Sequence, residues 1–167
     1  MESLAPNSVW RGHRVRFEHA GGLTPDQFGR AKAKGVVSVI NPQRAPPPPV
    51  SRTLPTVPLA AVVPPGMVIA LGSDGEPRSP FVGMYYALSF PTDPRLPREE
   101  FVRGYTVGSA YAEFEERNKG LLARGMLADL AVLSQDIFTV PLVDLPKTES
   151  VLTLVGGRIV WDAQVVR

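Results

Sequence analysis

The first regular pattern along the chain is an alternation of apolar and charged side chains between Arg14 and His19. Val15, Phe17 and His19 fall on one side, and charged residues fall on the other. This two-residue period is typical of a β-strand. The charged side of this strand is too polar for a strand face that a helix covers. His19 is the last residue on the apolar side.

A helix and a buried strand are predicted next. Thr24 and Gln27 have the spacing of a capping box, and Pro25 suits the first position of a helix. Gly35 is placed to end this helix. Residues 36–40 (VVSVI) form a continuous apolar run, which is typical of a strand buried on both faces. A strand, a helix and a strand within about thirty residues predict two parallel strands joined by a right-handed crossover.

A proline-rich tract separates this unit from the next strand. Residues 42–65 hold nine of the chain's 18 prolines, and that density excludes a helix. We interpret the tract as an irregular linker rather than as a ligand for a peptide-binding domain. The apolar run 67–71 (MVIAL) predicts another strand, followed by Gly-Ser-Asp-Gly at 72–75. Asp74 therefore follows a buried parallel strand, where α/β folds place their catalytic residues.

The second half of the chain predicts two helices and then antiparallel strands. Residues 80–90 suit a short helix, and a longer helix begins after Pro97. The apolar face of the longer helix carries Phe101, Tyr105, Gly108 and Ala112. Strands are expected at 128–133, 151–155 and 158–161, with a hairpin turn at Gly156-Gly157.

The change of pattern predicts two parts. We expect an α/β part over residues 1–122, which includes the irregular segment 42–65, and an all-β part over residues 123–167. The boundary is placed near Ala123, where the helical pattern has ended.

Composition narrows the class of protein. The 167 residues are 44% hydrophobic and 20% charged, as in a globular chain. With 18 basic and 16 acidic side chains the net charge is +2, and no stripe of Lys and Arg indicates a nucleic-acid partner. No signal peptide or membrane-spanning run is present, so we expect no membrane partner and a cytoplasmic location. The absence of cysteine fits that location and excludes thiolate metal sites.

Three side chains are candidates for chemistry. His13 lies in a polar run and is interpreted as a surface residue. His19 and Asp74 are 55 residues apart, which is about two βα repeats and would place them at one rim of a parallel barrel, two strands apart. A metal ligand and a general base need that arrangement, because the base must reach the proton of a metal-bound water. Taken singly, each residue also suits a structural role, His19 at a strand end and Asp74 in a turn.

The candidate set is too small for a complete catalytic metal site. Catalytic zinc takes three protein ligands, usually His with Asp or Glu when Cys is absent. This chain offers His19 and Asp74 and little else that is suitably placed. Further ligands would have to come from another chain or from a missing segment.

Five segments carry a family resemblance. Residues 16–20 (RFEHA), 35–42 (GVVSVINP) and 70–75 (ALGSDG) resemble strands six, seven and eight of an amidohydrolase-superfamily barrel. Residues 105–134 and 155–160 resemble the final barrel helix and the composite β-sandwich beside it. Within the superfamily, the chain resembles the metal-dependent enzymes of amidohydrolase family 3, and the similarity covers nearly its whole length.

The resemblance implies a fold and a reaction. The fold would be α/β, a partial TIM (β/α)8 barrel followed by part of a composite β-sandwich. His19 would be a metal ligand, and Asp74 would contact the metal, take a proton from the bound water and pass it to the leaving amine. The reaction would be hydrolysis of a non-peptide C–N bond in a small amide or cyclic amide, with zinc or a similar divalent ion activating the water.

The sequence also departs from the family pattern. The family's remaining ligands would lie before Met1, and Gln43-Arg44 stands where a histidine is expected soon after Asn41-Pro42. We therefore expect a C-terminal fragment that is inactive by itself and that self-associates through open sheet edges. The alternative is a non-catalytic remnant or interaction module derived from an amidohydrolase. A small independent α/β enzyme is disfavoured, because the chain contains neither a Gly-x-Ser-x-Gly elbow nor a Gly-rich phosphate loop.

Overall fold

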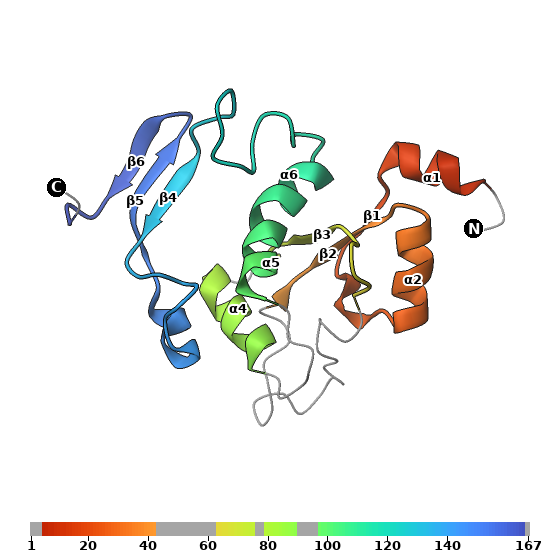
Figure 1. The fold of residues 1–167 in the computed structure, drawn as a ribbon, viewed down its shortest axis with the longest axis horizontal. Coiled ribbons are helices and arrows are strands. Elements are labelled where there is room, and N and C mark those ends of the chain that lie inside the picture. The colour runs from red at the N-terminus through yellow and green to blue at the C-terminus, as the bar shows by residue number, and fades with distance from the viewer. Residues whose placement is uncertain (1–4, 43–62, 76–78, 90–96, 166–167) are drawn as a thin grey trace.

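The fold is described from a computed structural model, which covers residues 5–42, 63–75, 79–89 and 97–165. Helices lie on both sides of a three-stranded parallel sheet, and a second sheet lies beyond them along the molecule's long axis (Figure 1). Most of the irregular segment expected at 42–65 falls outside the described residues.

The first sheet contains three parallel strands in chain order. They are β1 (Arg16–Phe17), β2 (Val37–Ile40) and β3 (Ile69–Leu71). The predicted buried strands are confirmed, since β3 is buried throughout and β2 nearly so. The first strand is shorter than the alternation from Arg14 to His19 predicts. Arg14 and His19 both have a left-handed backbone, with φ of 44° and 57°. These conformations end the extended backbone on either side of β1.

The predicted helix between the first two strands is confirmed as α2 (Pro25–Ala33). The Thr24 hydroxyl accepts a hydrogen bond from the Gln27 amide, and the Gln27 side chain accepts one from the Thr24 amide, which completes the capping box. Gly35 follows the helix with a φ of 68°, a conformation that glycine adopts without steric cost. A further helix, α1 (Asn7–His13), precedes β1 and was not predicted.

Two helical segments follow the parallel sheet. The first is α4 (Pro80–Leu88), where the Ser79 hydroxyl accepts a hydrogen bond from the Phe81 amide. The second begins at Arg98, as the sequence predicts, and passes through three consecutive pieces: α5 (Arg98–Arg103), the π-helical η4 (Gly104–Gly108) and α6 (Ser109–Ala112). It ends at Ala112, whereas the helical pattern of the sequence fades only near Asn118.

Glycines allow the second helix to press against β3. A Cβ atom on Gly108 would lie 2.0 Å from the Ile69 carbonyl oxygen, and one on Gly104 would lie 2.8 Å from Leu71 Cγ. At Gly108, only a residue without a side chain permits so close an approach of the two backbones, and at Gly104 the missing side chain leaves room for Leu71. The helix is thereby fixed against the strand that leads to Asp74.

The second sheet is antiparallel, as predicted. It contains β4 (Leu130–Leu133), β5 (Ser150–Val155) and β6 (Arg158–Asp162). Gly156 and Gly157, with φ of 56° and 76°, form the tight turn between β5 and β6. The connection from β4 to β5 contains a short 3-10 helix, η5 (Leu142–Lys147).

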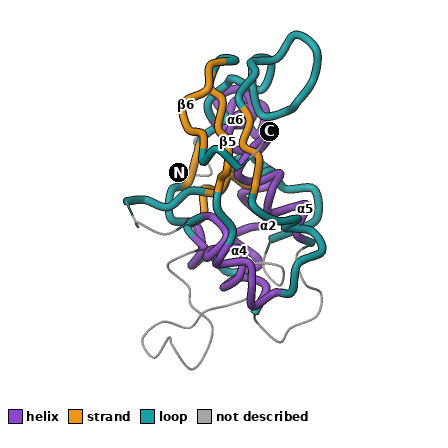
Figure 2. The backbone as a smooth tube through the Cα atoms, turned by 90° about the vertical axis from the view of Figure 1, so that its left-hand side faces the viewer, coloured by secondary structure: helices purple, strands orange, loops and turns teal. Residues whose placement is uncertain are grey.

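One apolar core joins the first sheet to the segment before β5. Phe28, Phe101 and Leu145 are fully buried within this core. Arg98 also donates hydrogen bonds to the carbonyl oxygens of Ile137 and Val140, at 2.8 and 2.7 Å. Both views place α4 below the second sheet, beside this connection (Figures 1 and 2). The core therefore crosses residue 123, and the division into parts at that position stays a prediction.

Candidate active site

Three polar side chains meet at the carboxyl ends of the parallel strands. His19 lies two residues after β1, Asn41 directly follows β2, and Asp74 lies three residues after β3. Parallel strands end at the same edge of a sheet, so these short extensions bring the side chains to one place. Strand order β1-β2-β3 puts Asn41 between the other two.

The distances show which of these groups interact. His19 Nδ1 lies 3.0 Å from Asn41 Oδ1 and 3.6 Å from Asp74 Oδ2. The first separation is that of a hydrogen bond, whereas the second is too long for one. His19 and Asp74 side chains are 53% and 42% exposed, so solvent or a small molecule reaches both. The structure brings the two candidates together across 55 residues of sequence, and the catalytic roles of both stay predictions.

His19 and Asp74 both have an unusual backbone. Their φ angles are 57° and 52°, in the left-handed region that residues with a side chain rarely adopt. His19 precedes the 3-10 helix η2 (Ala20–Gly22), and Asp74 precedes Gly75, whose φ is also positive. Strained residues of this kind gather at functional sites, where the surrounding structure maintains them.

Asn41 is the residue of this cluster that the sequence reasoning did not single out. In the sequence, Asn41 is only part of the Asn41-Pro42 family pattern, and that pattern predicts a histidine in the residues after it. Its position directly after a buried parallel strand is the same signal that identified Asp74. Asn41 is partly buried, and its side chain faces His19.

His13, interpreted from the sequence as a surface residue, lies in the last turn of α1 and is exposed. In the chain, His13 comes before β1, whereas His19 comes after it. His13 therefore provides an internal reference for any measurement on His19.

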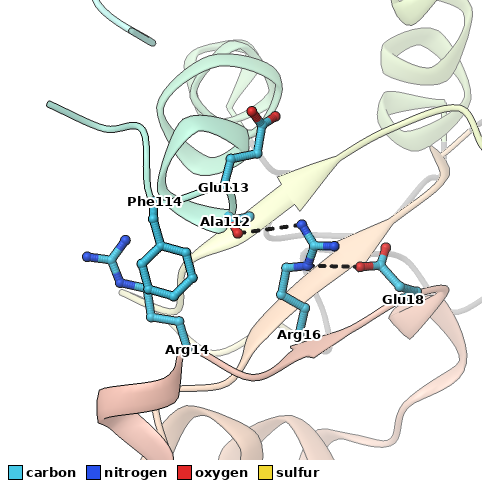
Figure 3. A pocket seen from close by; sticks show the side chains of 6 residues that line it. All are labelled: Arg14, Arg16, Glu18, Ala112, Glu113 and Phe114. Atoms are coloured by element: carbon cyan, nitrogen blue, oxygen red, sulfur yellow. Dashed lines mark hydrogen bonds and ion pairs between the residues drawn. The ribbon is translucent and has the colours of Figure 1, made fainter. Parts of the chain in front are cut away.

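The charged face of β1 forms part of a separate surface pocket of about 480 Å³ (Figure 3). Arg14 donates to the Tyr111 carbonyl oxygen at 3.0 Å, and Arg16 donates to the Ala112 carbonyl oxygen at 3.5 Å. These carbonyls belong to the last turn of α6, and the Tyr111 oxygen also accepts a hydrogen bond from the Phe114 amide. The polar side of the strand is thus explained by the helix end that lies over it.

Arg14 is held on several sides within this pocket. Its guanidinium donates two hydrogen bonds to the Glu116 carboxylate, at 2.9 and 2.5 Å. It also stacks on the rings of Tyr111 and Phe114, at 3.9 and 4.5 Å from their centroids. The hydrogen bond from Arg14 lowers the pKa of Glu116 to about 2, and the same bond raises the pKa of Arg14. The pocket's charges are therefore compensated internally.

Comparison with known proteins identifies the family. A family model described as "Amidohydrolase family" matches residues 1–161. The chain belongs to the amidohydrolase family. YtcJ of Bacillus subtilis (strain 168), which is named as an amidohydrolase, is 33% identical to this amidohydrolase chain over 110 residues. That match covers 58% of this chain and 21% of YtcJ.

Solved structures show the same fold. An adenosine deaminase from Xanthomonas campestris with bound zinc matches with a TM-score of 0.64 and 17% identity, over 89% of this chain and 37% of that one. A triazine hydrolase variant matches with a TM-score of 0.64 and 21% identity, over 92% of this chain and 37% of that one. The amidohydrolase chain is thus α/β, as expected, and spans about two-fifths of these structures.

The described residues of the amidohydrolase chain do not build a complete catalytic metal centre. Histidine and aspartate are ligands that zinc accepts, but a catalytic zinc takes three protein ligands. Over the described ranges, no group of three or more His, Cys, Asp or Glu side chains lies close enough to hold an ion. His19 and Asp74 supply two candidate ligands. No helix in these ranges is long and apolar enough to cross a membrane.

Proposed function

We propose that this chain is the C-terminal portion of a metal-dependent amidohydrolase that cleaves C–N bonds outside ordinary peptides, in amide or cyclic amide substrates. The observation that carries this proposal is the 3.6 Å approach of His19 Nδ1 and Asp74 Oδ2 at the carboxyl ends of two parallel strands. The family match over residues 1–161 supports it. Two proteins of similar fold, named adenosine deaminase and triazine hydrolase, are consistent with C–N bond chemistry.

The proposal gives the two residues different tasks. His19 would be a metal ligand, and Asp74 would contact the metal and transfer a proton from the attacking water to the leaving amine. The metal, zinc or a similar divalent ion, supplies a water of lowered pKa when it is bound. The exposure of both side chains leaves room for water and for a small substrate.

The proposed architecture explains why two ligands are present rather than three. We assign β1, β2 and β3 to strands six, seven and eight of a (β/α)8 barrel, and the antiparallel sheet to part of a composite β-sandwich. The other ligands then lie outside the described residues. Among the described residues, β1 and β3 each pair with β2 alone, and their outer edges also favour self-association of the isolated chain.

Activity assays test the proposal. The purified chain, supplied with zinc and small amides or cyclic amides, is expected to show no turnover, because its ligand set is incomplete. Turnover that is abolished by Asp74→Asn but retained by Asp144→Asn would contradict the proposed inactivity while supporting the site. Turnover unaffected by Asp74→Asn would contradict the proposed role of Asp74.

A second candidate function is a non-catalytic remnant or interaction module of amidohydrolase origin. The observation that favours it is the absence, over the described ranges, of a three-residue cluster of potential metal ligands. The two proposals differ in the zinc binding that they predict. A working part of an active site binds zinc at His19, whereas a remnant does not bind zinc.

A further inference from the structure

The side-chain amide of Asn41 is the hydrogen-bond partner of His19 within the candidate site. The separation between His19 Nδ1 and Asn41 Oδ1 is 3.0 Å, whereas Asp74 Oδ2 is 3.6 Å from the same nitrogen. The oxygen of an amide accepts hydrogen bonds and donates none, so this contact requires a proton on Nδ1. In a neutral imidazole, only one ring nitrogen carries a proton.

We propose that Asn41 is a positioning residue that holds His19 as the Nδ1–H tautomer and thereby leaves Nε2 as its open nitrogen. The proposal rests on the proposed function, in which His19 serves the reaction at this site. Histidines that ligate metals commonly donate their second ring N–H to a neighbouring oxygen, which fixes both the ring's orientation and its tautomer. In this chain the neighbouring oxygen comes from an amide on the adjacent strand.

The local structure makes Asn41 suitable for this task. It directly follows β2, so pairing with β1 on one side and β3 on the other limits its movement. The Gly72 amide donates a 3.0 Å hydrogen bond to the Ile40 carbonyl oxygen, which extends this pairing up to the residue before Asn41. Asn41 is also less exposed than His19. Asn41, whose movement is more restricted, therefore orients the more exposed His19 ring.

The His19 backbone increases the need for such a partner. His19 has a φ of 57° and lies between β1 and a short 3-10 helix, beyond the last paired residue of its strand. Its ring is half exposed, so packing alone restricts it little. The hydrogen bond from Nδ1 to Asn41 Oδ1 ties this ring to the sheet.

Nitrogen chemical shifts of the two imidazoles test the proposal directly. The full chain, labelled with ¹⁵N, is studied by long-range ¹H–¹⁵N correlation at about pH 8.5, two units above the ordinary histidine pKa of about 6.5. The chain has two histidines, and His13→Gln assigns their signals. We expect His19 to show a protonated Nδ1 and an unprotonated Nε2. An unprotonated Nδ1 in the wild-type chain would overturn the proposal without any variant.

Variants separate positioning from general effects on the fold. Asn41→Leu removes the acceptor at similar volume and is expected to convert most of the His19 population to the Nε2–H tautomer, which an imidazole without such a partner favours. Asn41→Asp retains an acceptor oxygen and should retain the Nδ1–H tautomer. The His13 signals should be unchanged in both. Asn118→Leu, which removes an exposed amide elsewhere, should leave His19 unchanged.

The outcomes distinguish this inference from the proposed function. An Nδ1–H tautomer that persists in Asn41→Leu would contradict the role of Asn41, yet it would leave the family assignment and the roles of His19 and Asp74 intact. If the leucine variant does not fold, an unprotonated Nδ1 in the wild-type spectrum still overturns the proposal. The measurement needs neither turnover nor metal, so failure of the proposed catalytic function would not affect it.

Discussion

Left-handed backbone conformations mark the candidate site at the scale of single residues. His19 and Asp74 both have φ between 50° and 60°, where the Cβ atom of an L-residue is crowded by the neighbouring carbonyl oxygen. Asp tolerates this region better than most residues because its short side chain bonds locally. Both residues are therefore held in position at some cost to stability.

Substitutions at Asp74 measure that cost. Asp74→Gly should be more stable than Asp74→Ala by about 1–2 kcal/mol, because glycine alone adopts a φ of 52° without crowding. At Asp26, in the first turn of α2, the order should reverse, with alanine favoured by about 1 kcal/mol. Urea unfolding of the four variants provides the comparison. An alanine variant at position 74 as stable as the glycine variant would show that the backbone there is not left-handed.

At the scale of secondary-structure elements, the close contact between η4 and β3 determines where the strand before Asp74 lies. Gly108→Ala should destabilise the chain by about 3 kcal/mol or more, since the new Cβ would lie 2.0 Å from the Ile69 carbonyl oxygen and backbone would have to move. Gly29→Ala is the matched control, because α2 leaves that position open and alanine should stabilise it by about 0.5–1 kcal/mol. Thermal unfolding measures both, and equal effects would argue against the close approach.

The pairing of Arg14 with Glu116 makes stability depend on pH. Glu116 has a pKa of about 2 in the folded chain and about 4.3 when unfolded, so its contribution is complete above the unfolded value and is lost as the pH falls towards 2. In Glu116→Gln this part of the pH dependence should be absent, and stability at pH 7 should be lower. Glu100→Gln, at an exposed ion pair with Arg103, should keep the wild-type profile. Melting temperatures between pH 2 and pH 6 test this, and parallel curves for Glu116→Gln and the wild type would contradict it.

The elements that the sequence predicts well are those defined by local chemistry. The capping box at Thr24, the buried run at 36–40 and the Gly156-Gly157 turn each depend on residues that are close in sequence, and each is confirmed, with the strand itself at 37–40. The shortness of β1 could not be predicted, because it depends on left-handed conformations at its two ends. The partner of the charged face could not be predicted either, since Tyr111 at the end of α6 lies 97 residues from Arg14 in sequence.

The candidate site could likewise be predicted only in part from the sequence. The 55-residue spacing of His19 and Asp74 predicted that they would meet at one rim, and the structure places His19 Nδ1 3.6 Å from Asp74 Oδ2. Asn41 has the same kind of position, but its amide becomes informative only when the His19 ring is seen beside it. A hydrogen bond between side chains on neighbouring strands leaves no periodic signal in the sequence.

At the scale of the whole molecule, the core makes the parallel sheet and the segment before β5 depend on each other. Leu145 is fully buried in η5, within the same core as Phe28 and Phe101. Leu145→Ala should lower the free energy of unfolding by about 2–5 kcal/mol, and probes in both sheets should report one transition. Val143→Ala, at a side chain that is 69% exposed, should change stability by about 0.5 kcal/mol or less. Separate transitions for the two sheets would contradict a shared core.

A zinc titration of the full chain followed by NMR tests whether His19 and Asp74 belong to one site. Zinc should perturb the His19 ring and the amide signals around Asp74 while leaving His13 unchanged. His19→Ala and Asp74→Asn should each weaken this binding about tenfold or more, whereas His13→Ala should not. Zinc binding that survives both site substitutions, or that perturbs only His13, would contradict the account.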